Sequence, residues 1–342
     1  MKSIKACRVS RISAIVTAFV LLWLACVPPH AHGQTDAQFS QYYEVPTFYN
    51  PAATGATDYL RIRGGARLQW VGIDNAPTTF AATADMPLKL FEKRFGVGVM
   101  FDSESMGLYK SLNMGVQLGY KFRKLGGEWT AAVQIGIYDQ GFKGSEVVLP
   151  DDDDYHEGTD DAIPTSDIHG TSLDLGLGVW YAHKYFQAGL SATHLNSPTV
   201  SMTAESGSGG GSESGGERKY EFQARRTLYF MAIGNIPIKN TLFELVPSLL
   251  VKSDFSFTTG ELTARARWKK MLSFGIGYRW NDAVIATVGL EFKNFYAGYS
   301  YDYATSAIMK ASSGSHEVFV GYSLKLDLSD KNRHRHKSIR LM

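Results

Sequence analysis

Residues Leu112–Phe122, LNMGVQLGYKF, form the stretch that decides the fold. Every second residue from Leu112 to Phe122 is apolar, and the residues between them are small or polar: Asn113, Gly115, Gln117, Gly119 and Lys121. Successive side chains of a β-strand point to opposite faces, so this period of two predicts a strand with one apolar face. At about 3.3 Å per residue its length is roughly 35 Å, enough to cross a bilayer core at a tilt of about 45°.

The same pattern recurs along the chain, and we predict fourteen strands of this kind. The predicted strands are Leu60–Val71, Thr78–Pro87, Phe95–Ser103, Ser111–Arg123, Glu128–Phe142, Gly170–Ala182, Tyr185–His194, Arg225–Ile236, Leu242–Ser253, Gly260–Trp268, Met271–Trp280, Ala283–Phe292, Asn294–Tyr303 and Glu317–Asp327. Among them, Leu242–Ser253 alternates poorly. An even number of strands is typical of a single-chain bacterial outer-membrane barrel.

The connections between these strands differ in length at the two ends of the predicted barrel. Those that follow even-numbered strands are short, and most carry lysine: Leu88–Arg94, Lys124–Gly127, His183-Lys184, Pro237–Thr241, Lys269-Lys270 and Lys293. The two long connections, Lys143–His169 and Leu195–Ala224, both follow odd-numbered strands. Outer-membrane barrels have short periplasmic turns and longer external loops. The sequence therefore predicts an all-β, antiparallel transmembrane barrel of about fourteen strands with two long external loops.

Composition excludes several other classes of protein. The 342 residues carry a net charge of +2, which is too close to neutral to indicate a nucleic-acid partner. No stretch after residue 33 approaches the roughly 20 apolar residues of a transmembrane helix. If the protein spans a membrane, it is predicted to do so with strands.

The first 33 residues have the pattern of a secretory signal peptide. Basic residues precede the apolar run Ile12–Val27, and a small-x-small sequence ends at Gly33. We predict cleavage near Gly33/Gln34 and export to the Gram-negative outer membrane. Both cysteines, Cys7 and Cys26, lie in this segment, so the mature chain is predicted to lack disulfides and thiol sites.

An aromatic arm lies between the predicted cleavage site and the first strand. It reads AQFSQYY over 37–43 and FYNPAATG over 48–55, with a break expected at Asn50-Pro51 and Gly55. Burying each aromatic side chain gains on the order of 1.5–3 kcal/mol. We therefore predict that the arm packs at or inside the periplasmic opening and narrows the pore. The alternative is that it docks on a periplasmic partner.

The arm resembles the amino-terminal signature of the PorP/SprF family of outer-membrane proteins. The signature residues are Gln38, Phe39, Ser40, Gln41, Tyr42, Asn50, Pro51 and Ala52. Further similarities occur at Arg67–Trp70, Pro77–Thr79, Phe295–Asp302 and Ser315–Val318. The resemblance thus spans nearly the whole mature chain.

This resemblance implies a non-enzymatic component of the type IX secretion and gliding machinery of Bacteroidetes. It implies contact with outer-membrane lipid and with other type IX components in the periplasm and outer membrane. For some family members it also implies the secretion or surface attachment of a large adhesin. A passive outer-membrane channel or solute transporter is the alternative function.

Arginines recur at positions predicted to face the lumen: Arg61, Arg63, Arg67, Arg265, Arg267 and Arg279. A charge facing lipid costs about 2–4 kcal/mol at the bilayer midplane, so the opposite orientation is disfavoured. Two interpretations remain open. The arginines attract anions into an open pore, or they pair with lumen carboxylates such as Asp102, Asp174 and Glu291.

We predict no catalytic, cofactor-binding or metal site. The histidines lack the spacing of HExxH or of a metal finger. The spacing gives no support to a hydrolase built from His169 beside Asp167 or from His194 beside Ser191. The acidic loop Asp151–Asp161 is either solvated or a Ca²⁺ site, and it lacks the regular spacing of a calcium loop.

Two further segments are polar and carry no motif for chemistry. Gly207–Gly216 is predicted to be a flexible linker, and Lys331–Arg340 is a basic tail that is either solvated or a docking segment. The predicted organisation is a signal peptide over 1–33 and a periplasmic arm over 34–59. A barrel over 60–328 and a basic periplasmic tail over 329–342 follow.

Overall fold

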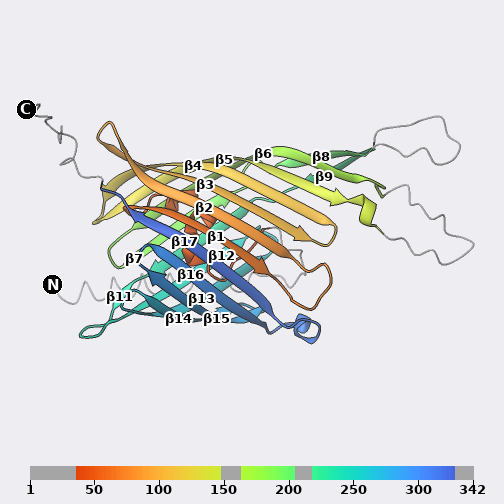
Figure 1. Ribbon diagram of the computed structural model, residues 1–342. Helices are drawn as coiled ribbons and strands as arrows, with labels where there is room; N and C mark the ends of the chain where they lie inside the picture. The colour runs from red at the N-terminus through yellow and green to blue at the C-terminus, as the bar shows by residue number, and fades with distance from the viewer. Residues whose placement is uncertain (1–35, 148–162, 205–217, 328–342) are drawn as a thin grey trace, which may run out of the picture.

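The computed structural model describes residues 36–147, 163–204 and 218–327, and fourteen of its strands close into an antiparallel barrel (Figure 1). The barrel strands are β1 (Tyr59–Leu68), β2 (Thr78–Leu90), β3 (Lys93–Met106), β4 (Tyr109–Lys124), β5 (Gly127–Lys143), β6 (Asp167–Ala182), β7 (Phe186–Thr193), β10 (Thr227–Gly234), β12 (Phe243–Ser253), β13 (Thr258–Trp268), β14 (Leu272–Arg279), β15 (Ala283–Phe292), β16 (Phe295–Ala304) and β17 (Ser315–Lys325). The barrel closes where β1 pairs with β17, from Tyr59 opposite Lys325 to Leu68 opposite His316. Closure leaves no free sheet edge, where backbone N–H and C=O groups would find no hydrogen-bond partner in a bilayer.

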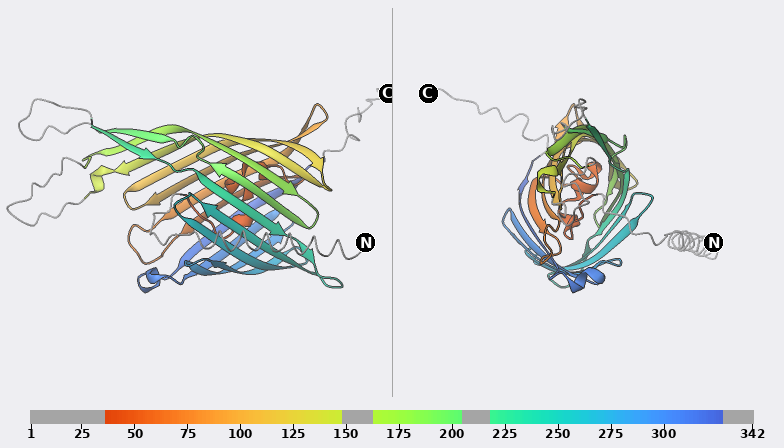
Figure 2. Two further views of the ribbon diagram at one scale, coloured as in Figure 1. Left: turned by 180° about the vertical axis from the view of Figure 1, so that it is seen from behind. Right: turned by 90° about the vertical axis from the view of Figure 1, so that its right-hand side faces the viewer.

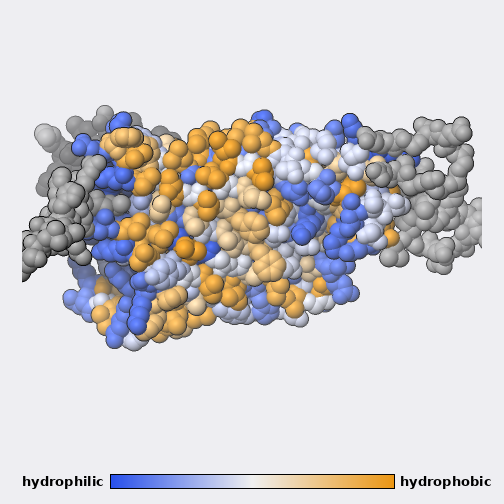
Figure 3. Space-filling model, turned by 45° about the horizontal axis from the view of Figure 1, so that its top comes forward, coloured by the Kyte–Doolittle hydropathy of each residue, from blue (hydrophilic) through white to orange (hydrophobic). Residues whose placement is uncertain are grey.

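The prediction of about fourteen antiparallel strands is confirmed, and each predicted strand overlaps one strand of the barrel. Leu112–Phe122 lies within β4, where the exposed fraction alternates between 63% at Val116 and 0% at Gln117. Apolar side chains therefore face outward and polar ones face the lumen, as in other membrane barrels. Figure 3 shows apolar side chains over the middle of the wall and hydrophilic ones gathered toward its ends. Within the described residues, no helix is long and apolar enough to span a bilayer.

At one end of the barrel, tight turns connect neighbouring strands. The β2–β3 turn at Phe91-Glu92 and the β13–β14 turn at Lys269-Lys270 have φ between 48° and 61° at both residues. Positive φ at both central residues is the mark of type I′ turns, whose twist matches that of the flanking strands. We call this the short-turn end. The opposite end, which carries the β5–β6 and β7–β10 connections, is the long-loop end (Figure 1).

The poor alternation of Leu242–Ser253 reflects two apolar residues on the inward face of β12, Val246 and Leu250, which are 5% and 1% exposed. The same strand also contains a proline. Pro247 lies in the middle of β12, opposite Gly234 at the end of β10. Proline has no N–H to donate to the sheet ladder. The ladder is interrupted here and resumes where the two-residue β11 (Ile236–Pro237) pairs with Leu245 and Glu244.

The connection Leu195–Ala224, predicted as a long external loop, contains a hairpin instead. Its strands are β8 (Thr199–Ala204) and β9 (Arg218–Gln223), which pair with each other beyond the long-loop end (Figure 1). Val200 and Met202 alternate with exposed Ser201 and Thr203, and they pack with residues of β5 and β6 in one buried cluster. This period-two pattern is short and stands beside a glycine-rich segment, which is why the prediction missed it.

Two other connections at the long-loop end carry single 3-10 turns, η3 (Gly144–Glu146) and η4 (Ala307–Lys310). The predicted signal peptide, the acidic loop Asp151–Asp161, the linker Gly207–Gly216 and the tail Lys331–Arg340 lie outside the described residues.

The alternation of β14 generates a prediction about assembly. Ile276 is 71% exposed on the lipid face, whereas Ser273 faces the lumen, where its hydroxyl lies 3.4 Å from the Gly289 carbonyl. Ile276→Arg should lose about 2–4 kcal/mol of stability in the bilayer, and Ser273→Arg on the same strand should fold nearly normally. The folded fraction is measured by the heat-dependent shift in electrophoretic mobility after refolding into vesicles. Equal yields for the two variants would contradict the register.

Candidate functional site

The arm that precedes β1 lies inside the barrel (Figure 2, right). It contains three short helical turns: η1 (Tyr42–Glu44), α2 (Pro46–Tyr49) and η2 (Pro51–Ala53). The eight signature residues are all buried: Gln38, Phe39, Ser40, Gln41, Tyr42, Asn50, Pro51 and Ala52. We call residues 36–55 the plug.

The plug extends through much of the length of the lumen. At the short-turn end the Gly55 N–H donates to Asp85 of β2 at 2.8 Å. In the long-loop half Asp36 contacts His194, which directly follows β7. Of the segment predicted as an arm over 34–59, residues 36–55 thus lie inside the barrel, and Tyr59 is the first residue of β1.

Ser40 is at the centre of a buried charged network. Its hydroxyl donates to Asp302 at 2.7 Å and accepts from Arg67 at 3.0 Å and from Arg279 at 2.8 Å. Both arginines also pair with Asp302, at 2.7 Å from Arg67 and 3.2 Å from Arg279. These four residues are at most 4% exposed. Because a buried charge without a partner is costly, the network fixes the plug to strands β1, β14 and β16.

Two glutamates complete the network. The carboxylate of Glu317 accepts the backbone N–H groups of Ser40 and Gln41, both at 2.8 Å, and pairs with Arg67 at 3.2 Å. Glu261 pairs with Arg279 at 2.8 Å. The wall thus binds the backbone of the plug as well as its side chains, and charge-assisted hydrogen bonds of this kind are among the stronger ones.

A second group of charges holds the first helical turn. Glu44 pairs with Arg265 at 3.1 Å and with Arg63 at 3.6 Å. The Arg265 guanidinium also lies over the ring of Tyr43, 3.3 Å from the ring centroid. A desolvated cation over an aromatic ring contributes about 2 kcal/mol.

The aromatic residues of the plug pack on one another and on the wall. Phe39 meets Phe48 edge to face at a centroid distance of 5.2 Å and meets Phe319 of β17 at 5.3 Å. Tyr49 meets Tyr229 of β10 at 5.4 Å, and its hydroxyl accepts the Phe39 N–H at 2.8 Å. The plug therefore has an apolar core that it shares with the barrel.

Asn50 joins the plug to the backbone of the wall. Its side-chain oxygen accepts the Ala52 N–H at 2.8 Å and caps η2, while its amide nitrogen donates to the carbonyls of Val179 and Leu190 at 3.1 and 3.2 Å. Gly178 and Gly189 make this approach possible. A Cβ atom at Gly178 would lie 2.1 Å from the Asn50 oxygen, and one at Gly189 would lie 2.6 Å from its nitrogen.

Gly55 ends the plug where the chain turns into β1. Its φ of +61° favours glycine, and a Cβ there would lie 2.8 Å from the Met86 carbonyl oxygen. Lys121 donates to the Gly55 carbonyl and pairs with Glu128 at 2.6 Å. Just upstream, the Thr54 hydroxyl donates to Gln117 at 2.7 Å.

Each of the six arginines predicted to face the lumen pairs with a carboxylate. Beyond those already described, Arg61 pairs with Asp85 at 3.1 Å and Arg267 with Glu244 at 2.5 Å, both near the short-turn end. The arginines thus pair with carboxylates, as in the second of the two interpretations, but the partners in these ion pairs are other than Asp102, Asp174 and Glu291.

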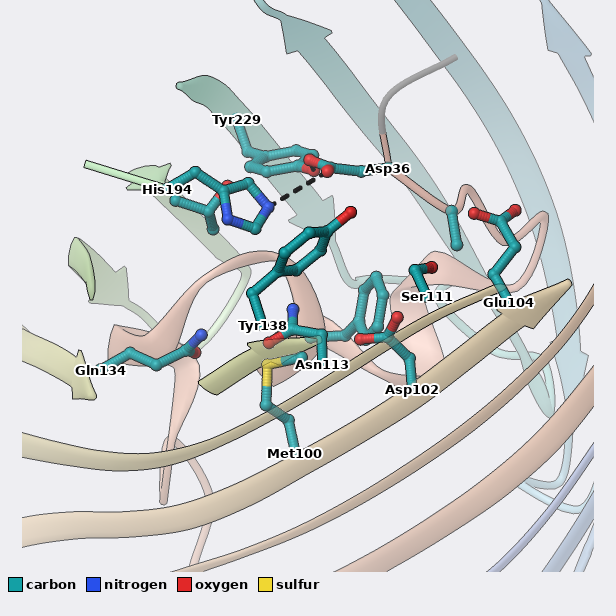
Figure 4. Close-up of a pocket in the computed structure, with 13 residues that line it drawn as sticks. Asp36, Met100, Asp102, Glu104, Ser111, Asn113, Gln134, Tyr138, His194 and Tyr229 are labelled. Carbon is teal, nitrogen blue, oxygen red and sulfur yellow. Dashed lines mark hydrogen bonds and ion pairs between the residues drawn. The ribbon is translucent and has the colours of Figure 1, made fainter. Parts of the chain in front are cut away.

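His194 holds the first described residue of the plug. Its Nδ1 lies 3.0 Å from Asp174, and its Nε2 lies 3.2 Å from Asp36 (Figure 4). Asp36 also accepts from the Tyr229 hydroxyl at 2.6 Å, and its backbone carbonyl accepts from Lys252 at 2.6 Å. Both ring nitrogens of His194 therefore face carboxylates, and the ring joins Asp36 of the plug to Asp174 of β6.

Neither candidate hydrolase pair is assembled. The Ser191 hydroxyl donates to the Tyr49 carbonyl at 2.6 Å, which leaves His194 paired with carboxylates alone. His169 is exposed and lies 3.7 Å from Asp139, while Asp167 accepts from Ser145. Among the described residues, no three His, Cys, Asp or Glu side chains are grouped so as to hold a metal ion.

A small cavity lies between the plug and strands β3 to β5. It has a volume of about 30 Å³ and is lined by acidic and polar side chains that include Asp102, Glu104, Asn113 and Gln134 (Figure 4). A cavity needs about 10–15 Å³ to hold a water molecule, so this one has room for one or two. It is too small for an organic substrate.

Several residues at the contact between plug and wall were not among the predicted site residues: Asp36 and Glu44 of the plug, and Gly178, Gly189, Glu261, Asp302 and Glu317 of the wall. The wall carboxylates occupy the inward phase of their strands, so the alternation places them in the lumen but does not identify their partners. The two wall glycines lie within strands, where glycine often marks a close backbone approach.

A closed barrel with an anchored, buried plug defines the class of this protein, a plugged outer-membrane β-barrel. The sequence matches the family described as type IX secretion system membrane protein PorP/SprF over residues 31–322. The chain therefore belongs to this family and is a membrane component of the type IX secretion system.

Comparison with solved structures shows the fold alone. A Pseudomonas aeruginosa FadL homologue is 9% identical with a TM-score of 0.50, covering 82% of this chain and 94% of that one. The Ralstonia pickettii toluene transporter TbuX is 11% identical with a TM-score of 0.49, covering 83% and 94%. A comparison with curated proteins found no match.

The charged network predicts unequal effects for two lumen arginines. Arg279→Met should cost about 3–5 kcal/mol, because it leaves Glu261 and Asp302 buried with fewer partners. Arg267→Met should cost about 0–1 kcal/mol, since the Arg267 side chain is 31% exposed at the barrel mouth. Urea-unfolding midpoints in vesicles measure both effects. Similar losses for the two variants would show that the plug network contributes no special stability.

Proposed function

We propose that this protein is a non-enzymatic docking component of the type IX machinery, which supports the secretion or surface attachment of a partner adhesin. The observation that carries the proposal is the plug, which lies buried inside the lumen and contacts a network of buried ion pairs in the wall. A barrel closed in this way offers its two ends and its outer wall to partners, and not its interior.

The alternative is a passive channel or solute transporter, which requires the plug to leave or shift. Release would separate Ser40 from Arg67 and Arg279, Glu44 from Arg265 and Asp36 from His194. The Asn50 bonds to the wall backbone would break in the same step. Many coupled contacts must therefore be lost together, which favours a plug that stays in place.

We further propose that the chain is made with a signal peptide cleaved near Gly33/Gln34 and belongs to a gliding-type machinery of Bacteroidetes. The short-turn end then faces the periplasm and the long-loop end faces outward, as in other outer-membrane barrels. Other type IX components in the periplasm would meet the lysine-bearing turns. The β8–β9 hairpin would meet cell-surface partners such as an adhesin.

This orientation predicts where external protease cuts. Protease added to intact cells should cleave within Lys143–His169 or Leu195–Ala224, because these connections would lie outside. The turns Lys269-Lys270 and Lys293 should be cut only after the outer membrane is permeabilised. Fragment masses report the sites, and cleavage at the lysine turns of intact cells would reverse the orientation.

The docking role and the channel role are separated by removing most of the plug. The wild-type barrel should show no stable conductance in planar bilayers, whereas a variant lacking Gln38–Tyr49 should insert and conduct. In the native host, loss of the whole protein should abolish surface display of the adhesin, whatever the permeability to small solutes. Stable unit conductance of the wild type, or normal adhesin display without the protein, would overturn the proposed function.

A further inference from the structure

The lipid-facing wall is hollowed on one side of the barrel. A groove of about 940 Å³ runs over the outer surface across strands β3, β4, β5, β6, β7, β10 and β12. Leu118, Val133, Leu177 and Leu190 line it, and each is 44–57% exposed. Its volume is at the upper end of the range of about 300–1,000 Å³ seen for ligand pockets. The groove is therefore large enough for a bulky apolar ligand.

Only the sheet backbone separates this groove from the plug. Ser191 and Tyr229 line the groove, yet their hydroxyls bond the Tyr49 carbonyl and Asp36 on the lumen side. Val179 and Leu190 also line it, and their carbonyls are the two that Asn50 binds. The plug thus fixes the floor of the groove, so that its shape is preformed.

The short-turn end of the groove is bordered first by aromatic rings and then by cations. The outward residues of β4 follow this order toward that end: Leu118, Tyr120, Phe122 and Lys124. On β3 the neighbouring outward residues are Phe95 and then Lys93, whose Nζ lies 5.9 Å from the centroid of the Tyr120 ring. Phe95 and Tyr120 pack together at a centroid distance of 5.7 Å. Aromatic belts of this kind lie at the headgroup level of a bilayer.

We propose that this groove binds one anionic glycerophospholipid. Its phosphate lies between Lys93 and Lys124, its glycerol region lies beside Phe95 and Tyr120, and its acyl chains follow the aliphatic floor toward Leu190. This inference goes beyond the proposed docking function, because it assigns a ligand to the outer wall.

The chemistry of the groove favours a lipid over other occupants. An acyl chain matches a long aliphatic floor that already faces the membrane, and exposed lysines at its end attract an anionic headgroup. An acidic protein would satisfy the lysines but would leave the aliphatic floor unused. A neutral lipid would use the floor but not the lysines.

The test is native mass spectrometry of the protein released from nanodiscs, with dioleoylphosphatidylglycerol and dioleoylphosphatidylcholine as probes. The wild type should retain one phosphatidylglycerol at least tenfold more tightly than phosphatidylcholine. Ala131→Trp or Ala192→Trp, which fill the groove, should weaken this binding at least tenfold. Ala286→Trp places the same ring on the outward face of β15 and should leave binding unchanged.

The headgroup site is tested in the same assay. The double variant Lys93→Gln, Lys124→Gln should bind phosphatidylglycerol no better than phosphatidylcholine, while Lys293→Gln, at another short turn, should keep the preference. The heat-dependent mobility shift verifies folding, and Ala192→Leu replaces any tryptophan variant that fails it. Equal binding by Ala131→Trp and Ala286→Trp would overturn the proposal, since the lipid would then be annular only. If the double lysine variant binds lipid as the wild type does but no longer binds an acidic partner protein, that result would also overturn the proposal.

Discussion

The structure depends on the contact between Ser40 and the charges of the barrel wall. Arg67, Arg279, Asp302 and Glu317 lie in the interior of a narrow barrel, where water has little access. Charges there are tolerated only when they are paired and hydrogen-bonded. The plug completes this pairing, since one hydroxyl and two backbone N–H groups bind all four residues. The wall and the plug therefore form one folded unit.

The plug is also bound to the wall at the opposite side of the lumen. Gly178 and Gly189 leave the wall backbone bare, and Asn50 binds the exposed carbonyls beside them. Within Asn50-Pro51-Ala52, the Asn50 side chain thus caps the helical turn η2 and attaches it to β6 and β7. This dual use of a single side chain gives a physical reason for the Asn-Pro-Ala signature.

The sequence was sufficient for the barrel but not for the contacts inside it. The alternation in Leu112–Phe122 is local, so it revealed the strand and its outward face, and the same argument placed the six arginines in the lumen. Pairing partners depend on the whole closed barrel: Ser40 and Glu317 are 277 residues apart in the chain. The β8–β9 hairpin was hidden because its short strands flank a glycine-rich segment. The aromatic character of the arm indicated burial, but nothing local to it showed how far into the lumen it reaches.

The anchored plug lies inside the lumen and is bound to the wall on several sides. The most direct test of this account is hydrogen–deuterium exchange of the protein in nanodiscs, read by mass spectrometry of peptides covering residues 38–53. If the plug is an integral part of the barrel, its amides should be protected for as long as those of β4 and β5. Exchange of these amides within seconds, while the strands stay protected, would show that the plug leaves the lumen and would contradict the account.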